Sequence, residues 1–144
     1  MFVFKTLIRD KLVDNANIKT LFNAAATGSC AVRMAELQVS AVYPQVTIDY
    51  VGGATIGGMA GEEGRLYLRI ETKGGTGSEH GIKNLGQFRR NILSILDDTN
   101  HSATAVVYHC RKTNESGDRF DDINKCYYNT LGFDIWLKVN TTVP

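Results

Sequence analysis

The chain has 144 residues, a length that indicates one domain able to bury about 70% of the surface of its unfolded form. Apolar residues make up 43% and charged residues 22%, close to the globular average, which excludes wholesale disorder, a collagen-like chain and a coiled-coil rod. Sixteen Lys and Arg stand against 15 Asp and Glu, so the net charge is +1. A net charge this small produces no long-range electrostatic attraction to nucleic acid or to an anionic membrane, and we expect neither as a specific partner. This balance is compatible with a local charged patch.

The N-terminal segment lacks the features of a targeting signal. Arg9, Asp10 and Lys11 stand where a signal peptide would need its apolar stretch, and no run approaches the roughly 18 apolar residues of a membrane-spanning helix. We therefore expect synthesis in the cytosol.

The three cysteines are expected to be buried thiols. Cys30, Cys110 and Cys126 each lie in an apolar stretch, and no Cys-x-x-Cys pair is present. Neither a disulfide framework nor a zinc ribbon is indicated.

The first half of the chain predicts two helices followed by strands. Apolar residues recur at spacings of three and four from residue 4 to 12, and a second short helical segment covers residues 18–22. Short strands are expected at 30–34 and 37–43. Residues 45–51 alternate between apolar and polar side chains, as a half-buried strand does.

The second half is organised around two glycine-rich connections, expected at residues 52–64 and 74–81. Between them lies a clearly alternating strand, 65–72, with Leu66, Leu68 and Ile70 on its core side. An amphipathic helix is predicted over 82–97. The remaining prediction comprises a strand at 104–110, a charged loop at 111–122, a long final strand that ends near residue 139, and a flexible tail at 140–144.

These elements predict an α+β fold in one domain, residues 1–144, without a linker or an internal repeat. Alternation on several strands means that one face of the sheet is wet or meets another subunit, because a parallel core sheet would show near-continuous apolar runs. We expect a mostly antiparallel or mixed sheet with helices packed on one face.

The glycine clusters raise the question of a phosphate site. The segment Gly75-Thr-Gly77-Ser-Glu-His-Gly81 follows a strand and opens a helix, the context of a dinucleotide-binding turn. The next strand, however, ends in Cys110-Arg-Lys without an acidic residue placed for a ribose, and no Gly-Lys-Ser/Thr follows residues 52–64. Pliable connections that reach a neighbouring subunit are one interpretation, and for residues 52–64 a flexible, solvated hairpin is the alternative. A small nucleotide-binding enzyme stays as an alternative of a different class.

No catalytic constellation is predicted. His80, His101 and His109 include no pair at metal-ligand spacing, and His109 and Cys110 are strand neighbours whose side chains point to opposite faces. The acidic run at 118–122 lacks the spacing of a calcium loop. We expect a protein that is not an enzyme and has no catalytic residue, no cofactor and no metal.

The pattern as a whole resembles the tail terminator, or tail completion, proteins of long-tailed bacteriophages. The resemblance covers residues 4–139 in the order and length of the elements, carried by the helix pair at 7–22, the strands at 42–50 and 66–70, the helix at 82–96 and the closing strand at 127–136. The loop at 52–64 is richer in glycine than the family leads one to expect.

The resemblance implies a structural virion protein of the tail or neck, assembled in the bacterial host cytoplasm. Its implied partners are further copies of itself in a ring, typically of six, together with the tail tube protein and the connector or neck proteins of the head. Another neck, connector or tail tube protein is the alternative within the virion.

A candidate subunit or partner interface follows from side chains that point away from the expected core. On two strands these side chains mix aromatic rings, arginine and opposite charges, and two apolar residues lie in the glycine loop. An ordinary solvated strand face is the alternative. Trp136 is the residue most expected to be covered by a neighbour. The candidate residues are Ile56, Met59, Arg65, Tyr67, Arg69, Glu71, Asp134, Trp136 and Lys138.

Overall fold

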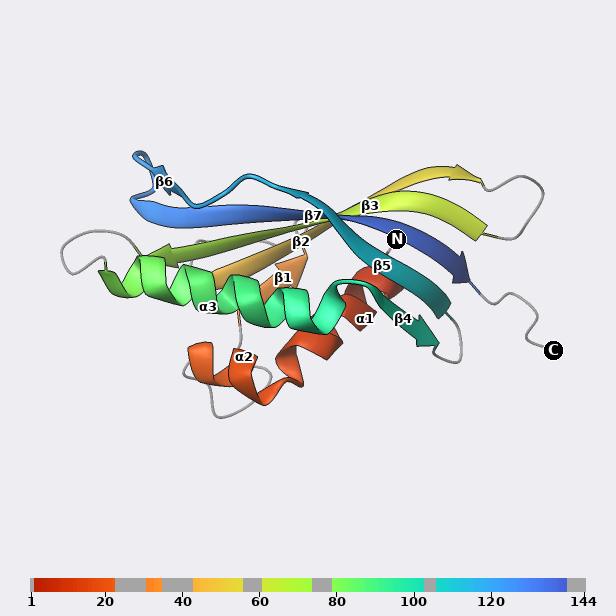
Figure 1. Cartoon of the computed structure of the whole chain (residues 1–144), viewed down its shortest axis with the longest axis horizontal. Coiled ribbons are helices and arrows are strands. Elements are labelled where there is room, and N and C mark those ends of the chain that lie inside the picture. Colours follow the sequence, from red (N-terminus) through yellow and green to blue (C-terminus); the bar gives the residue numbers. More distant parts are fainter. Residues whose placement is uncertain are drawn as a thin grey trace.

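A seven-stranded sheet and three helices make up the described part of the chain in the computed structural model (Figure 1). The structure describes residues 2–22, 31–34, 43–55, 61–73, 79–102 and 106–139. The helices are α1 (Phe2–Val13), α2 (Ala16–Leu21) and α3 (Glu79–Leu96). The strands are β1 (Val32–Met34), β2 (Gln45–Thr55), β3 (Gly61–Lys73), β4 (Thr99–Ser102), β5 (Val106–Glu115), β6 (Arg119–Asp121) and β7 (Cys126–Val139).

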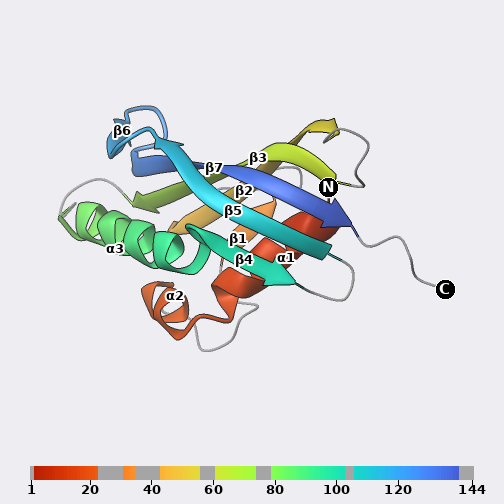
Figure 2. The ribbon, with the colours of Figure 1, turned by 45° about the vertical axis from the view of Figure 1, so that its right-hand side comes forward.

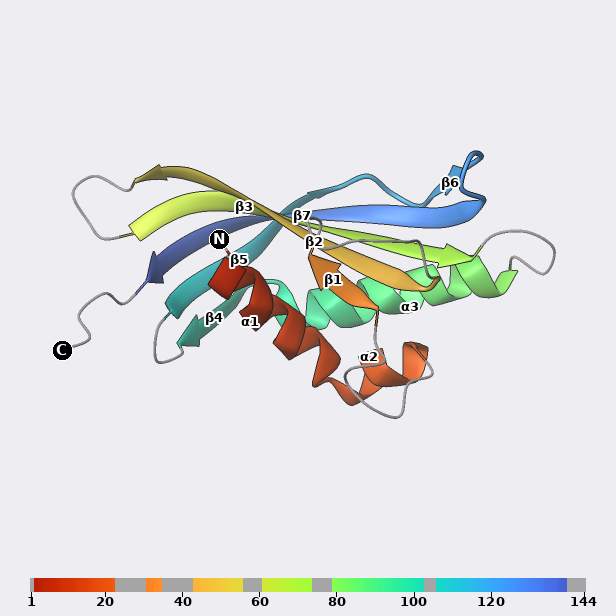
Figure 3. The ribbon, with the colours of Figure 1, turned by 180° about the vertical axis from the view of Figure 1, so that it is seen from behind.

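The sheet is mixed, with one parallel pairing. Its strand order is β1-β2-β3-β7-β5-β4, and β6 pairs with the beginning of β7. β1 runs parallel to β2, whereas every other pairing is antiparallel. All three helices lie on the same side of the sheet, as the views from the front and from behind both show (Figures 1 and 3): α1 and α3 pack on the strands, and α2 packs on the other two helices. The predicted α+β class, with helices on one face of a mixed sheet, is confirmed.

The helices form where their apolar spacing and end residues favour them. Along α1, Phe4, Ile8 and Leu12 recur on one side and are fully buried. The side chain of Asn15 caps α2, because its Oδ1 accepts hydrogen bonds from the backbone N–H groups of Asn17 (2.9 Å) and Ile18 (3.2 Å).

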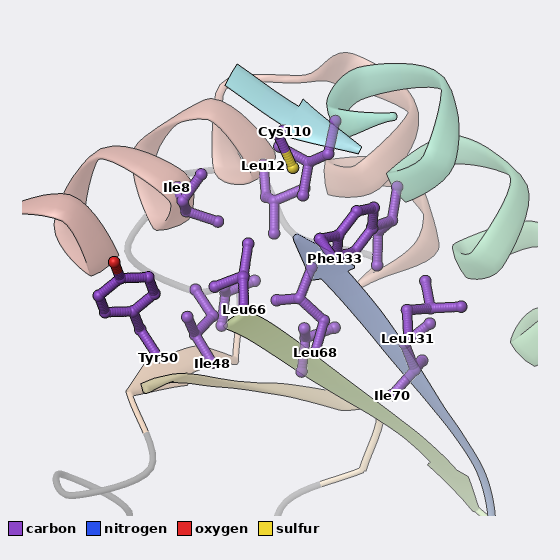
Figure 4. Packing of buried hydrophobic residues seen from close by; sticks show 14 of the residues in the cluster. Ile8, Leu12, Ile48, Tyr50, Leu66, Leu68, Ile70, Cys110, Leu131 and Phe133 are labelled. Carbon is purple, nitrogen blue, oxygen red and sulfur yellow. The ribbon is translucent and has the colours of Figure 1, made fainter. Parts of the chain in front are cut away.

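The core lies between the helices and the inner face of the sheet. Figure 4 shows Ile8 and Leu12 of α1 pointing toward Leu66, Leu68 and Phe133 of the strands. These side chains are at most 1% exposed. The alternation read from the sequence therefore places the correct side of β3 and β7 against the helices. The burial of Cys110 and Cys126 confirms two of the three thiol predictions, and Cys30 lies outside the described residues.

The predicted glycine loop at 52–64 is wrong at both ends, because strands run through these glycines. β2 continues to Thr55 and β3 begins at Gly61; Gly52 pairs with Gly64, and Gly61 pairs with Lys138. A Cβ atom at Gly64 would overlap the phenol ring of Tyr50, so glycine at this position lets that ring lie against the strand. Backbone pairing on both sides of β3 outweighs the weak strand preference of glycine. Residues 56–60 lie outside the described part.

Four further boundaries differ from the prediction. β5 extends to Glu115 and β6 follows it, where a charged loop was expected over 111–122. His101 belongs to β4, and His80 lies in the first turn of α3, where loops were expected. In each case, pairing with another strand or continuation of a helix decides the conformation, and local composition does not carry that information. The strand expected at 37–43 lies almost wholly outside the described residues, as does the tail at 140–144.

Candidate functional site

The face of the sheet turned away from the helices, called the outer face below, carries the predicted interface residues that the structure describes. β7 runs through its middle, between β3 and β5. Arg65, Tyr67 and Arg69 come from β3, and Asp134 and Trp136 come from β7. The structure thus brings residues from two distant segments together on one surface.

The side chain of Asp134 lies between two arginines. In the strand register, Asp134 pairs with Arg65 on one side and Arg111 on the other. Arg65 Nε lies 3.8 Å from Asp134 Oδ1, and both side chains are more than half exposed (65% and 59%). A hydrogen bond with Tyr67, followed by the charge of Asp134, raises the pKa of Arg65. Exposed pairs of this kind contribute at most about 1 kcal/mol to folding, so stability alone does not account for this row of charges.

The next outward-facing row along β7 is centred on Trp136. This residue pairs with Glu63 of β3 and His109 of β5, and it is only partly buried. Trp136 and Val51, whose exposure is 55%, line a hollow of about 540 Å³ together with Arg65, Arg111 and Asp134. A large aromatic ring and an exposed aliphatic side chain set among opposite charges are typical of a protein-binding surface.

Glu71 lies on the outer face but is not open to a partner. It is 7% exposed, and its Oε1 accepts a hydrogen bond from Gln45 Nε2 (2.9 Å) while Cys126 Sγ lies 3.4 Å from its Oε2. The alternation places Glu71 on the correct side of β3, but its expected accessibility is wrong. Gln45 of β2, Cys126 of β7 and Tyr43 from the bend before β2 lie around the carboxylate. Burial, with a hydrogen bond to Cys126, raises the pKa of Tyr43 to about 12.

Arg69 holds β6 against the sheet. Its guanidinium carbon lies 4.0 Å from the centre of the Tyr128 ring, and its Nη2 lies 3.7 Å from Asp121 Oδ2. A guanidinium group is attracted both to the face of an aromatic ring and to a carboxylate, so these two contacts join β3 to β7 and β6. Arg69 therefore serves mainly the fold, although its side chain remains 38% exposed.

The remaining predicted residues lie wholly or partly outside the described residues. Ile56 and Met59 fall in the gap between β2 and β3. Lys138 belongs to β7 and pairs with Gly61, but the position of its side chain is not among the described features.

The described residues bring together few groups suited to covalent or metal chemistry. Among them, no three His, Cys, Asp or Glu side chains are arranged to hold a metal ion. Burial raises the pKa of Cys110 to about 12, which keeps this thiol protonated at neutral pH. His109 lies on the opposite face of β5 and pairs with Asn100 through a 2.7 Å contact of its Nδ1. None of the helices in the described ranges is long and apolar enough to span a membrane.

The described part of the glycine motif at 75–81 has a packing explanation. The carbonyl of Gly81 accepts a hydrogen bond from Thr72 Oγ1 (2.8 Å), and a Cβ atom there would overlap the backbone carbonyl of Lys73. Gly81 thus allows the start of α3 to lie close to the end of β3.

The sequence matches no protein-family model and no curated protein. A solved structure does share its architecture. The match has a TM-score of 0.63 and covers 90% of this chain and 90% of the other, at 12% sequence identity. That chain comes from the virion of a native gene transfer agent particle. The two chains have the same fold.

Several residues of this surface escaped the sequence analysis. Val51 is the last member of the alternation that begins at Gln45, and its position in that alternation could have placed it on the outer face. Glu63 and Arg111 were assigned to loops, and their neighbours became evident only from the strand pairing. Ile123, which is 90% exposed in the turn between β6 and β7, is an isolated apolar residue in a charged segment.

Proposed function

We propose that this protein is a structural component of a phage-like virion that forms a ring at the head-proximal end of a tail tube. The observation that carries the proposal is the fold shared, over nine tenths of both chains, with a chain of the gene transfer agent virion. The proposed partners are further copies of the chain, a tail tube protein and the connector or neck proteins of a head. The proposed place is therefore the virion, reached by assembly in the host cytoplasm.

The outer face supports a role in binding proteins. A ring closes through contacts between two different surfaces of each subunit. This subunit has two such surfaces, the solvent-exposed outer face of the sheet and the side covered by helices. Trp136 and Val51 provide apolar area, and Arg65, Arg111, Glu63 and Asp134 provide charges of both signs. Within this proposal the protein acts by ordered docking and performs no turnover.

The proposal is tested by mixing the purified protein with purified phage tail tubes and, separately, with head connectors. Negative-stain electron microscopy should show a ring at one end of the tubes, and native mass spectrometry should give an oligomer, with six copies expected. Trp136→Asp should prevent capping, whereas Lys83→Glu, an exposed change on the helix side, should not. Absence of binding to both tubes and connectors would contradict the proposal.

The enzyme alternative makes a different prediction. A nucleotide that binds only the folded state must raise the thermal midpoint. We expect no shift with NAD or ATP analogues, and a saturable shift would favour the alternative.

A further inference from the structure

A glycine lies on the outer face in the middle of β7. Figure 2 shows β7 between β3 and β5. Tyr67 of β3 pairs with Gly132 on one side, and Asn114 of β5 pairs with it on the other. Glycine inside a strand weakens it, and often marks a place where another group approaches the backbone closely. Gly132 therefore draws attention to the side chains that lie over it.

The side chain of Asn114 takes the space above Gly132. A Cβ atom at position 132 would overlap Asn114 Oδ1 and would lie 3.1 Å from Asn114 Cγ, whereas Tyr67 Cε1 would lie at an ordinary 3.5 Å. Gly132 is itself buried, although Asn114 is exposed. Glycine at this position thus lets the carboxamide of Asn114 lie close against β7.

An irregularity in β5 places Asn114 on this face. Lys112 pairs with Phe133 and Asn114 pairs with Gly132, so Thr113 is an extra residue opposite β7. In a regular strand, Thr113 would stand opposite Gly132 and Asn114 would turn toward the helices, because successive side chains alternate between faces. Bulges of this kind re-aim a side chain. Two features that weaken a sheet, a bulge and an interior glycine, together position one carboxamide.

This carboxamide makes no hydrogen bond within the part of the chain that the structure describes. The adjacent side chains of β5 do have partners: Lys112 Nζ lies 2.9 Å from Glu115 Oε1, and Thr113 Oγ1 lies 3.5 Å from the carbonyl oxygen of Gly132. The side chain that the bulge and the glycine position is therefore available to a group from outside the chain.

The chemistry and the place of the carboxamide indicate its partner. It offers an N–H donor beside a carbonyl acceptor, a pair that a peptide group of another protein satisfies on both sides. The next outward row along β7 carries Asp134 between Arg65 and Arg111, and the row after it carries Trp136. Asn114 therefore extends the proposed contact surface toward the middle of the strand.

We propose that the Asn114 carboxamide binds a backbone peptide group of the next copy in the ring, and that Gly132 is the positioning residue that holds this carboxamide in place. The inference rests on the proposed function, for which it names a hydrogen-bonding group. The next copy is the partner because each ring subunit binds its neighbours through two different surfaces, and the outer face is one of the two that this subunit offers.

Two single variants and their combination test this role. Asn114→Ala should weaken self-assembly about tenfold, the usual effect of losing roughly one hydrogen bond. Its stability should match the wild type, because no bond within the described chain is lost. Gly132→Ala should weaken assembly to a similar extent, and the double variant should be no weaker than either, because Gly132 acts through Asn114. Sedimentation over a concentration series measures assembly, and Lys83→Glu serves as the control.

Circular dichroism and urea denaturation check that each variant is folded. If Gly132→Ala is unfolded, Asn114→Asp replaces it; this variant keeps the acceptor, loses the donor and should also assemble more weakly.

Wild-type assembly of Asn114→Ala would overturn the inference, as would a loss of stability without a loss of assembly. A double variant much weaker than both single variants would overturn the positioning role. If the wild type still capped tail tubes in these cases, the proposed function would stand without this contact. Loss of capping in Asn114→Ala with normal self-assembly would assign the carboxamide to another protein and overturn the inference. A wild type that neither assembles nor caps tubes would contradict both proposals.

Discussion

The guanidinium group of Arg89 in α3 makes a two-pronged ion pair with the carboxylate of Glu115 at the end of β5. Arg89 Nε lies 2.7 Å from Glu115 Oε2, and Nη2 lies 2.6 Å from Oε1. Lys112 Nζ adds a third contact at 2.9 Å. The pair ties the helix to a part of β5 that the sequence alone predicts to be a loop.

Arg89→Ala should lower the free energy of unfolding by about 1 to 3 kcal/mol. The side chains are two thirds or more buried, and hydrogen bonds between charged groups in such positions contribute about that much. Urea denaturation at pH 7 measures the change. Arg90→Ala, at the exposed neighbouring position, should stay within about 0.5 kcal/mol of the wild type. Equal effects of the two substitutions would contradict the assignment.

The same pair predicts a dependence of stability on pH. Hydrogen bonds from Arg89, assisted by Lys112, lower the pKa of Glu115 from 4.5 to about 2. Because the folded value is the lower one, the stabilisation is complete above about pH 4.5 and is lost as the pH falls toward 2. The difference in unfolding free energy between the wild type and Glu115→Gln should therefore shrink between pH 5 and pH 2. A difference that stays constant over this range would refute the prediction.

Two glycines of α3 should respond to alanine in opposite directions. At Gly81 a Cβ atom would overlap the backbone carbonyl of Lys73 and crowd Tyr127, so Gly81→Ala should destabilise the protein. At Gly86 no atom lies within 4 Å of the added Cβ, and alanine should stabilise the helix by about 0.5 to 1 kcal/mol. Thermal melts of the two variants measure the difference in sign.

Substitutions of Glu71 and Arg65, both on β3, should have different effects, the first on folding and the second on binding. Glu71→Ala should cost about 1 to 3 kcal/mol of stability, because it removes a buried carboxylate that accepts a hydrogen bond from Gln45 Nε2 at 2.9 Å. Arg65→Ala should leave stability within about 0.5 kcal/mol, because its pair with Asp134 is exposed. Chemical denaturation of both variants, with self-assembly measured in parallel, should show a stability defect in the first and an assembly defect in the second.

Much of the inner face of the sheet could be predicted from the sequence, because side chains that face the core are apolar and recur at a regular spacing. Leu66, Leu68 and Ile70 alternate, and the apolar stripe of α3 recurs at helical spacing, so the pattern follows directly from which side meets the core. The outer face has no such constraint. Glu71, on that face, became buried through neighbours from β2 and β7. Strand pairing is likewise hidden in the sequence, since Gly61 and Gly64 became strand residues by pairing with β7.

The candidate site was predictable only where alternation fixes the side of a strand. The placement of Arg65 and Trp136 on the outer face follows from their phase relative to the core residues. That Asp134 lies between Arg65 and Arg111, and that Val51 shares a hollow with Trp136, depends on the order of the strands in the sheet. Strand order and register arise from contacts between distant segments, which a single sequence does not display.

Electron microscopy of the purified protein incubated with isolated phage tail tubes shows whether the protein caps them. We expect closed rings seated at one end of the tubes, and their loss in Trp136→Asp while Lys83→Glu behaves like the wild type. Tubes that remain uncapped, with connectors also unbound and the wild-type chain folded, would contradict it.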